Sequence, residues 1–200
     1  MKDIIINSTM ERIEKNTTYD KVKLLEIKYG LESLYLSVTK ILVIFIICMI
    51  MQTTRELISF LIGFSILRAT GFGLHTKKSW QCWVTSIPIF TIIPYFIKKF
   101  TIPVNLLYFS LPILLLLIIL YAPADTEKRP LINNKKRKIY KVLSSITACL
   151  YLFMIFYLNN PFINSVLFYS LLLDVIVINP VSYKLFGLKY KNYLNYERRK

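Results

Sequence analysis

The fold of this chain is decided by an uncharged stretch that reads Ile102-Pro-Val-Asn-Leu-Leu-Tyr-Phe-Ser-Leu-Pro-Ile-Leu-Leu-Leu-Leu-Ile-Ile-Leu-Tyr121. A helix of about 20 residues is long enough to cross the hydrocarbon core of a lipid bilayer. A water-soluble domain would have difficulty hiding so long an apolar run, and 55% of the whole chain is hydrophobic. The stretch therefore predicts a transmembrane helix.

Five apolar segments of similar length flank this stretch and predict further crossings of the bilayer. They cover 34–52, 56–74, 80–97, 141–158 and 161–180. Lys40 interrupts the first and Arg68 the second, so these two either carry their charges to the interface or form a shorter hairpin that does not fully cross. The sequence therefore predicts an all-α, polytopic integral membrane protein with about six transmembrane helices.

The residues ahead of the first apolar segment have a different pattern. Over 3–32, apolar side chains recur at roughly helical spacing among Glu and Lys, with a break around Asn16-Thr17-Thr18. Such a pattern is typical of one or two amphipathic helices that lie on a membrane surface, although a solvated arm that only packs on the membrane domain has the same pattern. We therefore expect an N-terminal arm over 1–33, a six-span domain over 34–182 and a basic C-terminal tail over 183–200.

The positive charge of the chain indicates its orientation. The formal net charge is +15, and with six spans and both termini in the cytoplasm, 23 of the 26 Lys and Arg residues lie on the cytoplasmic side. Cytoplasmic loops of membrane proteins retain Lys and Arg in this way. Because the basic residues lie between apolar blocks, we assign them to membrane topology and to an acidic partner, and we expect no nucleic-acid binding.

The three cysteines are widely spaced and form no CxxC pattern. This spacing argues against a disulfide framework and against a zinc site, so we expect no metal and no cofactor. Cys48 and Cys149 lie inside apolar segments with no histidine nearby, and we predict that both are buried and unreactive. The third cysteine, Cys82, is different.

Cys82 follows the only histidine of the chain, His75, by seven residues. A histidine can take the proton of a thiol, and the resulting thiolate is a strong nucleophile. In one continuous helix the two residues would lie about 10 Å apart along the axis, which is too far for proton transfer. Gly71, Gly73 and a polar connection over 76–79 allow the chain to bend between them. We predict a folded-back loop at the cytoplasmic face.

Two acidic residues are further candidates for a third catalytic residue or for a polar network. Asp174 lies within an apolar segment, where a carboxylate is costly and by default functional. Arg68, Lys40, a lysine of a neighbouring helix and His75 are all possible partners for it. Asp125 lies in a proline-containing turn after the fourth apolar segment.

A basic run follows that turn, and two lysines follow His75. Such residues can bind an acidic peptide segment, but a topology determinant that faces anionic lipid has the same composition. The residues are Lys77, Lys78, Lys135, Lys136, Arg137 and Lys138.

Taken together, these residues resemble the accessory gene regulator B (AgrB) family. The resemblance rests on Arg68, Gly73, His75 and Cys82 in the order R-x4-G-x-H-x6-C, then on Tyr-Ala-Pro-Ala-Asp-Thr-Glu from residue 121 and the basic run. It covers essentially the whole chain and includes Tyr-Gly-Leu-Glu over 29–32. One departure is that the family often has paired glycines where this chain has Gly-Phe-Gly over 71–73.

The resemblance implies a membrane cysteine endopeptidase that matures an AgrD-type propeptide in quorum sensing. Cys82 would attack a peptide carbonyl, and His75 would deprotonate Cys82 and then protonate the leaving amine. An internal thiol or hydroxyl of the peptide would then close a thiolactone or lactone ring. Arg68 and Gly73 would be supporting residues, with Ser79 as a further donor. The resemblance also implies a homodimer in the bacterial cytoplasmic membrane.

Two other classes of function fit parts of the sequence. In the first, the protein is a small non-enzymatic membrane transporter or exporter of a signalling peptide, and Asp174, Arg68 and His75 line a polar path. In the second, it is a structural partner of a sensor kinase. The peptidase is the favoured hypothesis.

Overall fold

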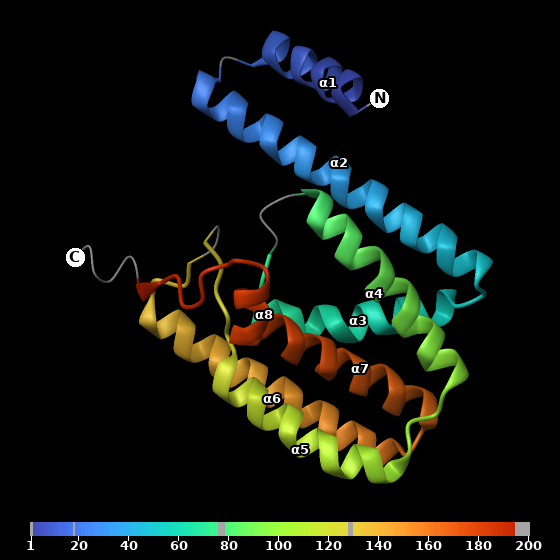
Figure 1. Cartoon of the computed structure of the whole chain (residues 1–200). Helices are drawn as coiled ribbons and strands as arrows, with labels where there is room; N and C mark the ends of the chain where they lie inside the picture. The colour runs from blue at the N-terminus through green and yellow to red at the C-terminus, as the bar shows by residue number, and fades with distance from the viewer. Residues whose placement is uncertain (1, 18, 76–78, 128–129, 195–200) are drawn as a thin grey trace. The chain divides into compact units, whose positions relative to one another are not determined.

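The computed structural model describes residues 2–17, 19–75, 79–127 and 130–194. Within these residues the secondary structure is helical, which confirms the predicted all-α class (Figure 1). The helices are α1 (Lys2–Asn16), α2 (Lys21–Ile50), α3 (Thr54–Gly71), α4 (Ser79–Lys99), α5 (Val104–Tyr121), α6 (Asn134–Leu158), α7 (Pro161–Ile178) and α8 (Pro180–Leu185).

Five of these helices are long and apolar enough to cross a membrane, namely α2, α4, α5, α6 and α7. The protein is therefore a multi-pass membrane protein. The sixth predicted span corresponds to α3, which is not among the five because its 18 residues include Arg55, Glu56 and Arg68. A sixth crossing, and with it the cytoplasmic location of both termini, stays a prediction.

The chain divides into two compact units, Met1–Ile47 and Cys48–Lys200. In the first unit, α1 ends at Asn16 and α2 begins at Lys21, so two helices form with the break where the sequence predicted it. Helix α2 continues without interruption past residue 33, so the second arm helix and the first span are one helix. The segment has no proline, and a single glycine, Gly30, is tolerated in a helix.

In the second unit, α3 and α7 lie side by side and form the centre (Figure 1). Small residues bring the two backbones together, because a Cβ atom added at Gly63 would lie only 2.8 Å from Ser170 Oγ. Close approach through small residues is how helices pack where lipid, and not water, surrounds them. Tyr151 of α6 donates a hydrogen bond of 2.9 Å to the Gly63 carbonyl at this crossing.

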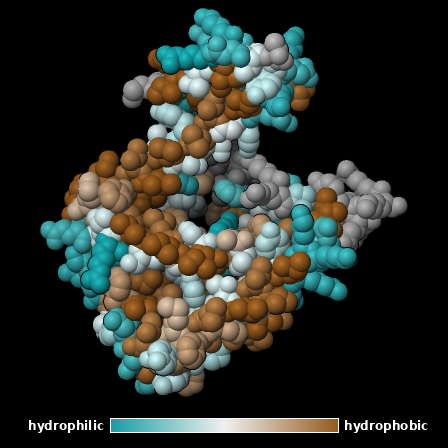
Figure 2. Space-filling model, turned by 180° about the vertical axis from the view of Figure 1, so that it is seen from behind, coloured by the Kyte–Doolittle hydropathy of each residue, from teal (hydrophilic) through white to brown (hydrophobic). Residues whose placement is uncertain are grey.

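The surface of the second unit fits a membrane environment. Figure 2 shows a face that is largely hydrophobic, with hydrophilic residues gathered mainly towards its edges. Cys149 of α6 is exposed, so the prediction that it is buried is wrong, whereas Cys48 is buried as predicted. The reason is that an apolar residue of a transmembrane helix can face lipid as well as protein.

The connection between α6 and α7 is short, as the sequence predicted. Asn159 adopts a left-handed conformation, with φ 44°, and ends α6. The side chain of Asn160 accepts hydrogen bonds from the backbone amides of Phe162 and Ile163, and Pro161 begins α7. Asparagine caps and a proline in the first helical turn are favourable at these positions.

Candidate functional site

The loop that carries His75 is held through its backbone. We call residues 71–75 the His75 loop. The amide of Gly73 donates to the Ala124 carbonyl at 2.8 Å, and the amide of Ala124 donates to the Gly71 carbonyl at 2.9 Å. On its other side, the amide of Leu74 donates to the Val177 carbonyl at the end of α7, at 3.0 Å. The path of the backbone up to His75 is therefore fixed by two distant segments.

Arg68, near the end of α3, holds the same loop. Its Nη2 atom donates hydrogen bonds to the carbonyls of Gly73 and Leu74, at 3.2 and 2.7 Å. Hydrogen bonds from a charged donor are stronger than neutral ones. Arg68 thus stabilises the turn through which the chain leaves α3 and reaches His75.

Both the backbone conformation and the surroundings at position 73 require a glycine. Its φ of +100° lies in a region that residues with a side chain rarely adopt. A Cβ atom at this position would collide with Arg68 Nη1 and would lie 2.7 Å from Val177 Cγ1. The supporting role predicted for Gly73 therefore has a steric basis.

Asp174 of α7 lies directly beneath this loop. It is fully buried, and a Cβ atom added at Gly71 would lie 3.1 Å from Asp174 Oδ2. Of the possible partners left open by the sequence, Arg68 reaches the same loop, where a Cβ atom added at Gly73 would collide with its Nη1 atom. Neither carboxylate oxygen, nor Arg68 Nη1, has a hydrogen-bond partner within the described residues. Asp174 is therefore a buried carboxylate beside the start of the His75 loop, and its predicted place in a polar network stays a prediction.

Cys82 lies on the other side of the break between α3 and α4. Helix α4 begins at Ser79, and Cys82 is in its first turn, where the helix dipole stabilises an anion. The Cys82 side chain is half-buried, and its Sγ atom is 3.7 Å from Ser86 Oγ. His75 is exposed and lies outside both helices, so the two residues do not share one continuous helix, as predicted.

Three of the predicted residues lie wholly or partly outside the described residues. Lys77 and Lys78 are outside them altogether. Ser79 is the first residue of α4, but its side chain is not described. Their predicted roles, as a further donor and as part of a surface for an acidic segment, stay predictions.

Asp125 has a structural role. Its carboxylate accepts hydrogen bonds from the backbone amides of Asn192 and Tyr193, both at 2.8 Å, and of Leu131 at 3.4 Å. The Tyr183 hydroxyl donates to the backbone carbonyls of Ala124 and Asp125, at 3.3 and 3.0 Å. The segment after Tyr183 therefore folds back onto the turn around Asp125. The same turn holds the His75 loop through the backbone of Ala124.

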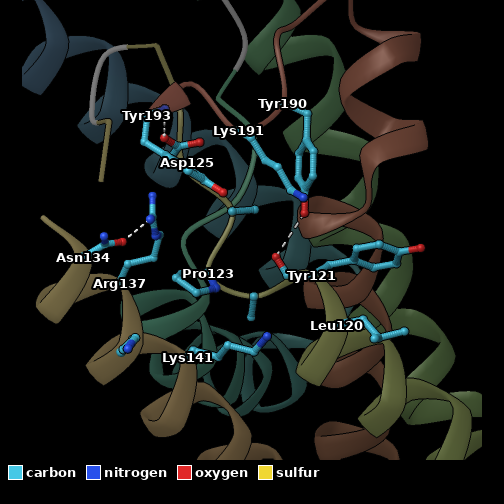
Figure 3. Close-up of a pocket in the computed structure, with 13 residues that line it drawn as sticks. Leu120, Tyr121, Pro123, Asp125, Asn134, Arg137, Lys141, Tyr190, Lys191 and Tyr193 are labelled. Carbon is cyan, nitrogen blue, oxygen red and sulfur yellow. Dashed lines mark hydrogen bonds between the residues drawn. The ribbon is translucent and has the colours of Figure 1, made fainter. Parts of the chain in front are cut away.

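The basic run lies on the first turn of α6, which the side chain of Asn133 caps. Arg137 and Lys138 line a cavity of about 280 Å³ beside the turn around Asp125 (Figure 3). Lys136 lines a second cavity, which also touches Phe72 of the His75 loop. Lys135 is exposed on the helix. Lys136 therefore lines a different cavity from Arg137 and Lys138, and the predicted binding of an acidic segment by this run stays a prediction.

Sequence reasoning missed four residues that build this region. Ala124 and Val177 hold the His75 loop through their backbone atoms, which leave no signal in the residue type. Lys141 and Lys191 line the 280 Å³ cavity with Arg137 and Lys138. Lys141 is one helical turn beyond the basic run, a spacing that could have indicated it.

On the peptidase hypothesis of the sequence analysis, replacing Arg68 by Gln is expected to lower kcat with little change in KM, because Arg68 donates its hydrogen bonds to the His75 loop. Loss of a charge-assisted hydrogen bond corresponds to a fall of roughly 10- to 100-fold. Steady-state kinetics of peptide cleavage by the purified protein would measure both kcat and KM. The matched control is Arg55→Gln at the other end of α3, where Arg55 is exposed and lies over the Phe162 ring. Equal losses in both variants would contradict the positioning role.

Comparison with known proteins adds a whole-chain relationship. The family model for accessory gene regulator B matches residues 6–178. A "Putative AgrB-like protein" from Clostridium acetobutylicum is 29% identical over 94% of this chain and 90% of its own length. One from Listeria welshimeri is 31% identical over 89% of this chain and 87% of its own length. "Accessory gene regulator protein B" from Staphylococcus carnosus is 26% identical over 78% of this chain and 82% of its own length. No solved structure matches the chain.

Proposed function

Because this chain belongs to the accessory gene regulator B family and so takes part in accessory gene regulator quorum sensing, we propose that it is a cysteine endopeptidase that processes an AgrD-type propeptide. The observation that carries this proposal is the break between α3 and α4. It separates Cys82, in the first turn of α4, from His75, on a loop pinned by Arg68, Ala124 and Val177. The only histidine of the chain is thus held on a defined backbone, four residues in sequence before the start of the helix that carries Cys82.

In the proposed reaction, His75 takes the proton of the Cys82 thiol, and the thiolate attacks the carbonyl carbon of a peptide bond. The carbon–nitrogen bond then breaks, and His75 returns the proton to the leaving amine. These steps release the C-terminal segment of the propeptide and leave a thioester on Cys82. A thiol or hydroxyl within the peptide attacks this thioester, which closes the thiolactone or lactone ring and frees Cys82.

A membrane location supports ring closure. Water competes with the internal nucleophile for the thioester, and exclusion of water from the site suppresses hydrolysis. Cys82 is half-buried two residues after Trp80, and tryptophan favours the membrane–water interface. We therefore place the active site at the cytoplasmic face of the bacterial cytoplasmic membrane. A homodimer stays a prediction.

The decisive experiment traps the thioester. The purified full-length protein is mixed with a propeptide in which the internal nucleophile is replaced by alanine, so that the ring cannot close. Mass spectrometry of the digested enzyme is expected to find the N-terminal propeptide fragment attached to Cys82. The Cys149→Ala protein, which removes an exposed thiol, should give the same adduct. An adduct on another residue, or release of product with no adduct under quenched conditions, would contradict the proposal.

A further inference from the structure

The 280 Å³ cavity lies where α5 ends and α6 begins. Leu120 and Tyr121 line it from α5, and Arg137 and Lys141 line it from α6. The C-terminal segment contributes Lys191. Figure 3 shows these side chains arranged around the turn that contains Pro123, with Arg137 and Lys191 on opposite sides and Lys141 beneath it. The cavity is thus formed by three segments that are distant in sequence.

The cavity carries an excess of positive charge. Four of its described lining residues are cationic, namely Arg137, Lys138, Lys141 and Lys191, and Asp125 is the acidic one among them. The Asp125 carboxylate already accepts three backbone hydrogen bonds, as described above, and is buried. These bonds do not remove its charge, but one carboxylate offsets only one of the four cations, so the cavity keeps an excess of positive charge and favours an anion.

The Arg137 guanidinium and the Lys191 backbone are held in place. The Arg137 guanidinium stacks on the Tyr193 ring, 3.6 Å from its centre. Lys191 has φ 57°, a conformation that is costly for a residue with a side chain. The hydrogen bonds from the next two backbone amides to Asp125 maintain this conformation. A preorganised guanidinium and a fixed backbone that carries a lysine are expected of a binding site more than of a diffuse basic surface.

One edge of the cavity continues into apolar surface. Phe109, Ile113, Leu116 and Leu120 follow one another at helical spacing along α5, and each is at least half exposed. This stripe ends at Leu120, which lines the cavity. A ligand that fills the site would therefore place its charge among the lysines and an apolar portion along α5. An acidic peptide segment has no long apolar portion that could pack along this stripe.

We propose that this cavity binds the headgroup of an anionic phospholipid, with an acyl chain along the exposed stripe of α5. Basic pockets between transmembrane helices on the cytoplasmic side are suited to phosphate headgroups. The turn over 121–125, which lines the cavity, also holds Gly73 through Ala124, so the bound lipid stabilises the His75 loop. Lipid binding at this cavity does not require peptidase activity.

The test uses the full-length protein in detergent and native mass spectrometry with two probes, dioleoyl phosphatidylglycerol and dioleoyl phosphatidylcholine. The wild type is expected to retain phosphatidylglycerol in preference to phosphatidylcholine. The Lys141→Gln/Lys191→Gln variant should bind it roughly 25-fold more weakly, because each cation near an anionic headgroup contributes about a fivefold factor. The matched control, Lys184→Gln/Lys189→Gln, removes two exposed lysines of the same C-terminal segment and should bind as the wild type does.

The Lys141→Arg/Lys191→Arg variant separates loss of charge from misfolding, because it keeps both charges and should retain the lipid. Equal binding of the two lipids, or equal losses in the two glutamine variants, would overturn the proposal. A hexaglutamate peptide provides the last comparison. If it bound the wild type and not Lys141→Gln/Lys191→Gln, while phosphatidylglycerol failed to bind, the cavity would be a peptide site.

Discussion

Replacement of Cys82 by alanine is expected to abolish propeptide cleavage while the protein still inserts into the membrane. The proposed reaction forms a covalent bond to the Cys82 sulfur, and removal of a catalytic nucleophile typically costs a factor of at least about 10³ in rate. His75→Ala should have a loss of the same order, because a nucleophile and its base act as a unit. Immunoblots of an epitope-tagged propeptide, with enzyme levels measured in the membrane fraction, would show the effect.

The other two cysteines provide the controls for this prediction. Cys149→Ala removes an exposed thiol and Cys48→Ala a buried one. Both variants should process the propeptide, with Cys48→Ala accumulating to a lower level if its packing is disturbed. Cleavage that persists in Cys82→Ala would remove the basis of the peptidase proposal. Loss of peptide export with cleavage intact would instead favour the transporter hypothesis.

Replacement of Gly73 by alanine is expected to have an effect nearly as large, although Gly73 takes no part in the chemistry. The backbone has φ +100°, and the added Cβ atom would collide with Arg68 Nη1 and approach Val177 Cγ1 at 2.7 Å. Relief of this overlap requires the His75 loop to move, and a displacement of about 1 Å can cost about 100-fold in rate. Processing assays on the purified variant would measure the loss.

Gly187 offers a closely matched control. It also has a positive φ, of 61°, but a Cβ atom there would meet nothing within 4 Å. Gly187→Ala therefore carries backbone strain without a collision and should retain nearly all activity. If both glycine variants lost activity equally, strain alone would explain the result, and the steric account of the His75 loop would be wrong.

Much of the fold could be predicted because the bilayer sets the length of the elements that cross it. Long apolar stretches such as 102–121 and 161–180 became helices α5 and α7 with nearly the predicted bounds. Helix α3 was harder to interpret, because its three charged residues resemble those of a surface helix by composition. Its packing against α4, α6 and α7 explains how such a helix lies inside the second unit.

The candidate site could be predicted only in part. His75 and Cys82 stood out because they are rare residue types in an apolar chain, and the need for a bend followed from helix geometry. The role of Asp125 could not be read from its residue type, because the carboxylate binds backbone amides of residues 131, 192 and 193. The sequence does not show that these segments meet.

The sequence by itself determined that this protein is a helical membrane protein, and it identified the residue types able to carry the chemistry. Composition and spacing are sufficient for this, because apolar length and side-chain reactivity are local properties. Only the tertiary structure decided how His75 is held and which lysines surround the cavity. The packing of α3 against α7 brings Arg68, Gly73 and Val177 together, and the backbone atoms of Ala124 and Val177 then fix the loop. Backbone hydrogen bonds carry no side-chain signature, so no pattern of residues could have predicted them.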